Sequence, residues 1–204
     1  MEQRAEAEQF PTVGPEVGQF LQFLVHLTGA RKIFECGSGF GYSAYWMGTA
    51  LPAEGEIVLT EIDADELAAA RTYLDQSEIS ANIRYEHGDA LEILVAEDED
   101  YDIILLDHEN ERYREGFEIA KKNIGQNGTI IADNILHSAE FSPGDVAACL
   151  IDGEINHGQN PSLQGILEFL HHIRVDSTVN SVVVPVGEGI VLSHPRDRTR
   201  DVEQ

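Results

Sequence analysis

Three alternating glycines follow an apolar segment early in the chain, and they constrain the fold more than any other feature. The segment Lys32–Cys36 has the composition of a buried strand, and it is followed by Gly37, Gly39 and Gly41. Glycine has no Cβ atom, so it accepts the positive φ of a tight turn and lets a ligand approach the backbone. Residues 42–51 read as a helix whose first N–H groups face the same place. A strand, a glycine turn and a helix in this order predict a site for a bulky cofactor.

The spacing of the glycines bears on which cofactor binds. A dinucleotide fingerprint has the spacing Gly-x-Gly-x-x-Gly, in which a pyrophosphate lies on the helix N-terminus. Here the spacing is Gly-x-Gly-x-Gly, and Glu35 precedes it by two residues, where a carboxylate repels a phosphate and suits an ammonium group. Glu61 ends the next apolar run, where an acid can accept hydrogen bonds from ribose hydroxyls. An amino acid joined to a ribonucleoside is S-adenosylmethionine, and this pattern disfavours the alternative of an NAD-dependent oxidoreductase.

The charge of the chain excludes two classes of partner. The 204 residues include 37 acidic and 13 basic ones, and the formal net charge is −24. Nucleic acids and anionic membranes are bound by basic faces, so we expect neither as a partner. The spread of acids along the chain and the 42% hydrophobic content argue against disorder. A surface this acidic is typical of a salt-adapted cytoplasmic protein, a hypothesis that a melting temperature insensitive to molar KCl would contradict.

We expect neither a targeting segment nor a membrane span. Residues 1–9 are polar and charged, unlike a signal peptide, and no run approaches the ~20 apolar residues of a membrane span. Cys36 and Cys149 are isolated, which favours reduced and buried thiols. The length fits a single cytoplasmic domain over residues 1–204, with residues 1–10 and 195–204 frayed.

Apolar runs alternate with amphipathic segments along the chain. The expected helices are residues 15–27, 42–51, 65–76, 113–124, 144–151 and 162–174, and the expected strands are residues 32–36, 56–60, 82–86, 101–107 and 129–132. Gly128 marks a turn, and residues 182–190 form a closing hairpin. This alternation predicts an α/β fold with a doubly wound, mostly parallel sheet and an antiparallel strand at its edge.

Oxygen-bearing side chains end three of the predicted strands. Glu61 ends the second strand, Asp107 ends the fourth, and Asp133 and Asn134 end the fifth. If the fourth and fifth strands are neighbours, their ends lie about 5 Å apart and the last three side chains converge. Carboxylate and amide oxygens suit Mg²⁺ or another divalent cation. An Asp at a strand end is also a common helix cap or turn former, and from spacing alone that interpretation stays open.

Three segments of the chain resemble the motifs of a known enzyme family. They are residues 35–43 (ECGSGFGYS), 107–113 (DHENERY) and 132–134 (ADN), supported by residues 13–21 and 184–189. In this order they are similar to the cation-dependent O-methyltransferases, the group that contains catechol and caffeoyl-CoA O-methyltransferases. The resemblance covers roughly residues 11–194. It implies a Rossmann-like sheet of seven strands and methyl transfer to a small-molecule acceptor with vicinal hydroxyls.

The resemblance also implies roles for matching residues. Asp107, Asp133 and Asn134 become the metal ligands, and Glu61 binds the ribose. Val13 covers the methionine part of S-adenosylmethionine, and residues 88–90 border the adenine. The full set of implied cofactor-binding residues is Val13, Glu35, Gly37, Ser38, Gly39, Tyr42, Ser43, Glu61, Ile62, Gly88, Asp89, Ala90 and Asp107.

One position departs from the family pattern. Where the family usually carries a lysine that serves as general base, this chain has Asn110, and an amide cannot take a proton near neutral pH. Either the metal, with Asp107 among its ligands, acidifies the acceptor hydroxyl without the help of a base, or another side chain serves as the base. The candidate bases are His108, Glu109, His137 and His157. A protein that binds the cofactor without turnover is the non-enzyme alternative.

The resemblance begins only about ten residues into the chain. Relatives often carry a further helix there that contributes to the substrate pocket and to dimer contacts. Its expected absence leaves a homodimer open. The acceptor pocket is expected to involve residues 134–160, whose conformation the sequence does not reveal.

Overall fold

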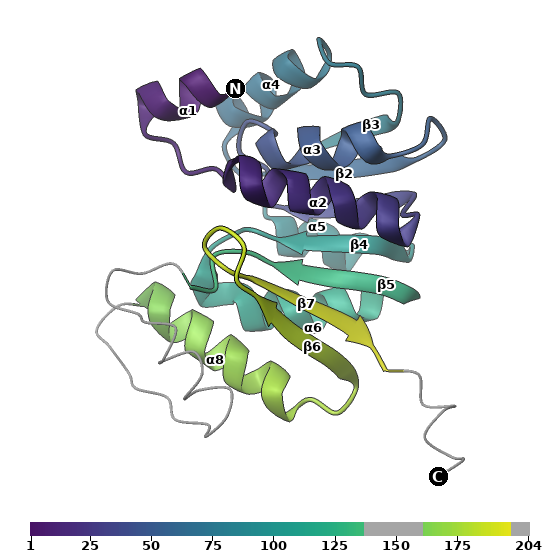
Figure 1. Cartoon of the computed structure of the whole chain (residues 1–204), viewed down its shortest axis with the longest axis vertical. Coiled ribbons are helices and arrows are strands. Elements are labelled where there is room, and N and C mark those ends of the chain that lie inside the picture. Colours follow the sequence, from purple (N-terminus) through teal and green to yellow (C-terminus); the bar gives the residue numbers. More distant parts are fainter. Residues whose placement is uncertain (137–160, 197–204) are drawn as a thin grey trace.

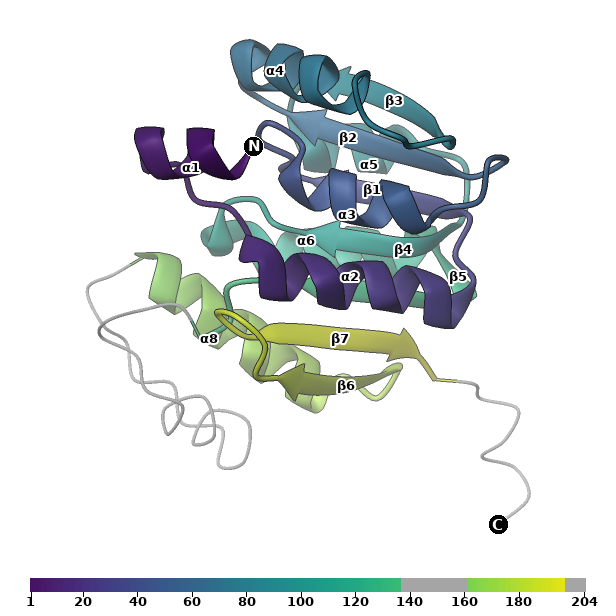
Figure 2. The ribbon, with the colours of Figure 1, turned by 45° about the horizontal axis from the view of Figure 1, so that its top comes forward.

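Seven strands form one mixed sheet in the computed structural model, which describes residues 1–136 and 161–196. The strands are β1 (Lys32–Cys36), β2 (Glu56–Glu61), β3 (Asn82–His87), β4 (Tyr101–Leu106), β5 (Ile124–Ala132), β6 (Val179–Val184) and β7 (Ile190–Pro195). Their order across the sheet is β3-β2-β1-β4-β5-β7-β6 (Figure 1 and, with β1 labelled, Figure 2). The order reverses between β1 and β4, which is where doubly wound sheets bind their ligands.

Helices cover both faces of this sheet (Figure 2). On one face lie α2 (Gly14–Thr28), α3 (Tyr42–Ala50) and α4 (Ala64–Leu74), and on the other lie α5 (Ala90–Ala96), α6 (Tyr113–Asn123) and α8 (Pro161–Val175). Two shorter helices are α1 (Glu2–Glu8) and the 3-10 turn η1 (Asn110–Arg112). Successive buried residues of a strand face opposite layers, so Ile33 packs with α2 and Phe34 packs with α6. The predicted α/β class and doubly wound sheet are confirmed.

The hairpin at the sheet edge is also confirmed. Strands β1 to β5 are parallel, and β7 pairs antiparallel with both β5 and β6. The antiparallel strand is therefore the inner strand of the hairpin, and β6 is the outermost strand. Residues 185–189 connect the two strands and bring Glu188 to the carboxyl end of β5, where Leu136 N–H donates to its carbonyl oxygen over 2.6 Å.

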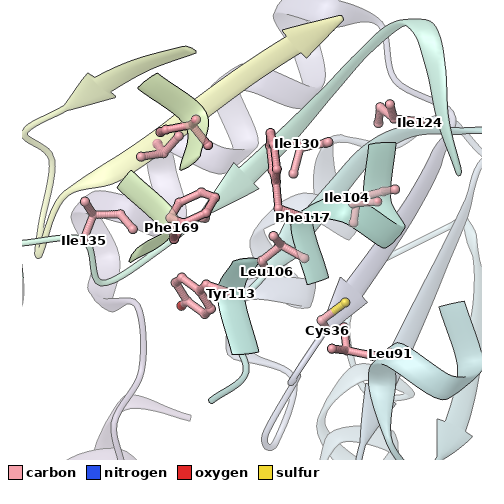
Figure 3. Close-up of a cluster of buried hydrophobic side chains, with 14 of the residues drawn as sticks. Cys36, Leu91, Ile104, Leu106, Tyr113, Phe117, Ile124, Ile130, Ile135 and Phe169 are labelled. Atoms are coloured by element: carbon pink, nitrogen blue, oxygen red, sulfur yellow. The ribbon is translucent and has the colours of Figure 1, made fainter. Parts of the chain in front are cut away.

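Aromatic side chains fill the layer between the sheet, α6 and α8 (Figure 3). The ring centroid of Phe169 lies 5.5 Å from that of Phe117 and 5.8 Å from that of Tyr113, both in edge-to-face geometry. All three side chains are fully buried, and burying a side chain such as Phe stabilises the fold by roughly 1.5–3 kcal/mol. This packing holds the start of α6 close behind the end of β4.

Local capping explains where several helices begin and end. The Asp63 carboxylate accepts hydrogen bonds from Asp65 N (2.8 Å) and Glu66 N (3.3 Å), and it therefore caps the start of α4. Gly29 ends α2 with φ of 67° and a hydrogen bond from its N–H to Val25 O.

Helix α5 was not expected from the sequence. It has only seven residues and buries only Leu91 and Leu94, too few to produce a clear helical period. The residue that marks the start of α5 is Asp89, whose carboxylate accepts hydrogen bonds from Leu91 N (2.8 Å) and Glu92 N (3.2 Å).

Strand β5 begins earlier than predicted. It starts at Ile124 instead of Thr129, and Gly128 lies inside the strand rather than in a turn. The pairing of β4 with β5 shifts between Tyr101 and Ile103, so an irregularity takes up the extra residues.

The prediction that residues 1–10 fray is wrong. Residues Glu2–Glu8 form α1, which is tied to the rest of the molecule by two long-range contacts. Arg4 Nη2 lies 2.7 Å from Glu66 Oε1, and Tyr42 Oη donates to Glu2 Oε1 over 3.0 Å. Both partners are distant in sequence, and local patterns do not reveal such contacts.

Several predictions fall on residues that the structure does not describe. They are the helix at residues 144–151, the thiol of Cys149, the candidate bases His137 and His157, and residues 197–204 of the end that was expected to fray. For residues 195 and 196 that expectation is wrong, because Pro195 ends β7 and Arg196 N donates to Thr178 O over 2.8 Å. Cys36 is buried as predicted, and its thiol is free. None of the helices in the described ranges has both the length and the apolar character needed to cross a membrane.

Candidate active site

A cavity of about 440 Å³ opens at the carboxyl ends of the central strands. This volume is in the range of small-molecule sites. Every predicted cofactor-binding residue except Glu35 lies on its wall, namely Val13, Gly37, Ser38, Gly39, Tyr42, Ser43, Glu61, Ile62, Gly88, Asp89, Ala90 and Asp107. The fold therefore gathers residues from five separate stretches of sequence around one space.

The glycine turn forms one wall because side chains do not fit there. A Cβ atom on Gly37 would lie 2.3 Å from the carbonyl oxygen of Asp107, and one on Gly39 would lie 2.9 Å from the ring of Phe10. Both glycines also have positive φ, 83° and 48°. The N–H groups of Gly37 and Ser38 donate to Thr60 O over 3.2 and 3.0 Å, which anchors the turn to β2.

Glu61 lies at the end of β2 and stabilises the same turn. Its Oε2 accepts a hydrogen bond from Gly39 N over 2.8 Å, and its Oε1 accepts one from Asp63 N over 2.9 Å. An ionised carboxylate offers about four acceptor positions, so both oxygens can still accept from a ligand. The residue predicted to bind the ribose is thus fixed at the cavity wall by two backbone contacts.

Glu35 lies beneath the turn and not on the cavity wall, which corrects the expectation of direct contact. It is fully buried and accepts a hydrogen bond from Ser43 Oγ, which does line the cavity. Burial raises the pKa of Glu35 to about 8, although the bond from Ser43 opposes this and the charge of Glu61 adds to it. Glu35 can therefore hold a proton near neutral pH and release it when a cation approaches.

The three side chains predicted to bind metal converge where β4 and β5 end. These strands are neighbours, and Asp133 N donates to Leu106 O over 3.2 Å just beyond their last paired residues. Asn134 Nδ2 donates to Asp107 Oδ1 over 3.4 Å. Asp107 and Asn134 line the cavity, and Asp133 is buried beside them.

The electrostatics of this group favour a cation. Burial raises the pKa of Asp107 well above its usual value, and the charges of Asp133, Glu35 and Glu188 raise it further. The three charged groups that raise this pKa are all carboxylates. Two carboxylates and an amide form a hard oxygen donor set, which fits Mg²⁺ or another divalent cation.

A second group has metal-like spacing but a different explanation. Glu118, His172 and Asp176 place one donor atom each within 4.8 Å of one another. Lys121 Nζ lies 2.7 Å from Glu118 Oε1 and 2.6 Å from Asp176 Oδ2, so its ammonium already neutralises the carboxylates. This group is an ion-pair network that joins α6 to the end of α8.

Asn110 is turned away from the cavity. Its Nδ2 donates to Ser162 Oγ in the first turn of α8 over 2.7 Å, and it is absent from the described wall. The closeness of α8 explains this, because a Cβ on Gly165 would lie 2.3 Å from Asn110 O. The position at which the family usually carries its lysine is thus used here for a contact between η1 and α8.

Two of the alternative bases line the cavity, namely His108 and Glu109. The ring centroids of His108 and Tyr113 lie 5.3 Å apart, and a Cβ on Gly116 would lie 2.8 Å from Cε1 of His108. Burial lowers the pKa of His108, so its imidazole is neutral at pH 7. Glu109 is exposed at the rim.

Sequence reasoning missed several wall residues, notably Phe10, Arg112 and Glu188. Phe10 precedes the predicted first helix, and Glu188 lies in the hairpin connection, so neither belongs to a periodic pattern. Arg112 Nη1 forms an ion pair of 2.6 Å with Asp89 Oδ2 across the cavity wall. The only available signal was charge, since Arg112 is one of few bases in an acidic chain.

The amino-acid sequence is similar to those of known O-methyltransferases. A family model described as O-methyltransferase matches residues 3–196. A catechol O-methyltransferase of Niastella koreensis is 27% identical over 179 residues, which cover 85% of this chain and 75% of that protein. Caffeoyl-CoA O-methyltransferase 1 of Zea mays is 26% identical over 187 residues, which cover 89% of this chain and 70% of that protein.

The fold is also similar to that of an O-methyltransferase of known structure. The O-methyltransferase of Bacillus cereus in complex with SAH has a TM-score of 0.79 and 27% identity, and the match covers 95% of this chain and 88% of that one. Because the family model matches far more than half of the residues, this chain belongs to the O-methyltransferase family.

Proposed function

We propose that this protein transfers the methyl group of S-adenosylmethionine to one hydroxyl of a small, catechol-like molecule with vicinal oxygens, and that it needs a divalent cation. The names of its relatives support the acceptor class, since they include a catechol and a caffeoyl-CoA O-methyltransferase. The B. cereus structure, which contains SAH, supports the methyl donor. The observation that carries the proposal is the meeting of Asp107 and Asn134 on the wall of the cavity that the glycine turn also lines, with Asp133 buried beside them.

The methyl donor fits the part of the cavity around the glycine turn. Glu61 offers acceptor oxygens for ribose hydroxyls, and the absence of Cβ atoms at Gly37 and Gly39 gives the donor access to the backbone. The buried carboxyl of Glu35 favours a cationic amino group nearby, because an adjacent positive charge stabilises its ionised form. Phe10 and Val13 cover the same space from the N-terminal side.

The acceptor is placed by the ends of β4 and β5. Asp107, Asp133 and Asn134 would hold the cation, which would supply Lewis acidity to an acceptor hydroxyl beside them. The acceptor oxygen then forms a bond to the methyl carbon while the carbon–sulfur bond breaks, giving a methyl ether, S-adenosylhomocysteine and one proton. The chain contributes mainly by orienting the two substrates for in-line attack.

We assign no side-chain base. Asn110 is engaged with Ser162, and a side-chain amide has no useful basicity. His108 has a lowered pKa and a buried ring, so it is a weak base at the wall. A cation held by Asp107, Asp133 and Asn134 would therefore have to supply the acidity that Asn110 and His108 do not.

Methyl transfer to a panel of catechols, measured with and without EDTA, tests the proposal. We expect turnover that EDTA abolishes and added Mg²⁺ restores. Undiminished activity in EDTA would remove the role given to Asp107, Asp133 and Asn134. Separate titrations with S-adenosylmethionine and NAD test the methyl donor, and we expect binding of the first only.

A second candidate function is binding of S-adenosylmethionine without efficient turnover. The contact between Asn110 and Ser162 favours it, because it leaves no base at the position that usually carries one. Tight binding of S-adenosylhomocysteine together with no methylation of any catechol in the panel would support this function over the first.

A further inference from the structure

The charges on the cavity wall are unevenly divided between the two signs. Among the described residues that line the cavity, five are acidic and one, Arg112, is basic. The acidic ones are Glu61, Asp89, Asp107, Glu109 and Glu188. Arg112 is already engaged, because its Nη1 lies 2.6 Å from Asp89 Oδ2 and its Nε lies 2.9 Å from Glu115 Oε2. None of the other lysines and arginines in residues 1–136 and 161–196 lines this space.

Two of the carboxylates lie at the acceptor end of the cavity, which is the part around Asp107 and Asn134. Glu109 follows Asp107 by two residues, beyond the end of β4, and is exposed at the rim. Glu188 lies in the hairpin connection, which the hydrogen bond from Leu136 N joins to the end of β5. The charge of Glu188 also raises the pKa of Asp107, so the two carboxyl groups act on each other. Two different loops thus bring negative charge to the acceptor end.

These two charges remain when a divalent cation is counted. The two positive charges of such an ion match the carboxylates of Asp107 and Asp133, which are its charged ligands in the proposed site. Glu109 and Glu188 are then left over. Asn110, at the position where the family usually carries a lysine, adds no positive charge. The acceptor end therefore stays negative with the cation in place.

The composition of the segment that follows Leu136 does not reverse this balance. Residues 137–160 contain four acidic residues and no lysine or arginine. We expect this segment to contribute to the acceptor pocket. Whatever its conformation, it cannot bring a lysine or an arginine to the acceptor.

We infer that the acceptor end of the cavity selects acceptors by charge, and that the preferred acceptor is a catechol whose side chain carries an ammonium group. The carboxylates of Glu109 and Glu188 attract a cationic side chain and repel a carboxylate or a phosphate. A coenzyme A thioester, which carries several phosphates, is the least suited acceptor, because the one arginine on the described wall is already paired. This inference rests on the proposed function, since it concerns the acceptor of that reaction.

Three catechols that differ in one group test the inference. They carry an ethylamine, an ethanol or an acetate side chain at the same ring position, so they are cationic, neutral and anionic at about pH 8, where ordinary histidines are neutral. We expect kcat/KM to fall in that order, by at least about tenfold from the first to the last at low ionic strength. Molar KCl should reduce this ratio, because salt screens exposed charges. Equal values for all three catechols, or a preference for the anionic one, would overturn the inference.

Two substitutions test which residues make the selection. Glu109→Gln and Glu188→Gln each remove one negative charge and keep the shape of the side chain. Each should lower the ratio of kcat/KM for the cationic catechol to that for the anionic one by about threefold, and the double variant should nearly abolish the preference. An unchanged ratio in the double variant would remove both residues from acceptor selection.

Glu54→Gln is the matched control. Glu54 is an exposed carboxylate that pairs with Arg31 just before β2, at the opposite edge of the sheet from the cavity. Its substitution changes the net charge of the protein by the same amount, and we expect it to leave the ratio as in wild type. A ratio that drops equally in Glu54→Gln would show an effect of overall charge and would overturn the assignment to Glu109 and Glu188.

The same catechols separate this inference from the proposed function. If none of the three is methylated, the proposed function fails, and calorimetric titration of each catechol into the protein with S-adenosylhomocysteine and Mg²⁺ measures the charge order as dissociation constants. Tightest binding of the cationic catechol, weakened in Glu109→Gln and Glu188→Gln, would support charge selection without turnover. Absence of binding by all three catechols would overturn the inference as well.

Discussion

Asn134 donates a hydrogen bond of 3.4 Å from Nδ2 to Asp107 Oδ1, and this contact joins the carboxyl ends of β4 and β5. Asn134 makes it with φ of 61°, in the left-handed region that Asn tolerates better than most residues. The contact turns the amide of Asn134 toward a half-buried carboxylate at the cavity wall. Two strand ends thereby become one candidate cation site.

Removing one carboxylate from this site should abolish the response to Mg²⁺. We expect Mg²⁺ to raise the melting temperature of the wild-type protein, since an ion that binds only the folded state stabilises it. In Asp133→Asn this rise should disappear, along with most methyl transfer. Asp176→Asn is the matched control, because Asp176 pairs with Lys121 away from the cavity, and its response to Mg²⁺ should persist. An unchanged response in Asp133→Asn would contradict the site.

Restoring a lysine at position 110 should increase turnover. Asn110→Lys removes the hydrogen bond to Ser162, at a cost of about 1 kcal/mol of stability. It adds an amine that can take the proton from the hydroxyl of the methyl acceptor. The measurement is kcat/KM over a range of pH. Asn110→Ala is the control, because it loses the same hydrogen bond without adding a base. A rise in both variants would show that the broken contact, not the amine, is responsible.

Phe10→Ala should weaken binding of S-adenosylhomocysteine. The Phe10 ring lies on the cavity wall over Gly39 and packs 4.9 Å from the ring of Phe40. Its removal exposes the ligand to water, and we expect a loss of about 1–2 kcal/mol, or about tenfold in Kd. Calorimetric titration measures this, with Val95→Ala as a control on an exposed helix position outside the cavity. Equal affinity in Phe10→Ala and wild type would remove Phe10 from the site.

Glu35 should make the ligand-free protein less stable as pH rises. Burial raises the folded-state pKa of Glu35 to about 8 from an ordinary value of 4.5, so the folded state binds the proton more tightly than the unfolded chain does. The stabilisation is complete below pH 4.5 and is lost as pH rises through about 8, and it is on the order of a few kcal/mol. Glu35→Gln removes this titration. The free energy of unfolding of wild type relative to Glu35→Gln should therefore decrease between about pH 5 and about pH 9, and a constant difference would refute the shift.

Molar KCl should raise the melting temperature. At a net charge of −24, repulsion among the acidic groups opposes folding, and salt screens it. Exposed ion pairs such as Arg31 with Glu54 contribute little, so their weakening by salt is a small opposing effect. A thermal melt in increasing KCl tests this hypothesis of salt adaptation, and a melting temperature that does not rise would contradict it.

Most of the sheet could be predicted from the sequence because its signals are local. The strand bounds of β1 follow from the apolar run before Gly37, and the caps of α2 and α4 follow from Gly29 and Asp63. Helix α5 was not predicted because its two buried leucines are too few to show a helical period. The early start of β5 was not predicted because an irregularity in its pairing with β4 shifts the register of the two strands.

The candidate site was predictable in part for the same reason. Residues that end strands lie at the same sheet edge once strand order is known, so Asp107 and Asn134 could be placed together from spacing. The position of Glu35 under the turn could not, because burial depends on how Ser43 and the helix pack over it. The engagement of Asn110 with Ser162 depends on α8, which lies about fifty residues further along the chain.

The amino-acid sequence by itself determined the succession of the strands along the chain, the glycine turn and the chemical types of side chain at each strand end, because these follow from periodicity and from the geometry of single residues. Only the tertiary structure decided that α1 is held by Glu66, that Phe10 lies on the cavity wall, and that Asn110 turns toward α8. Those outcomes depend on packing between distant segments, and the energies of such contacts are not encoded in any local pattern.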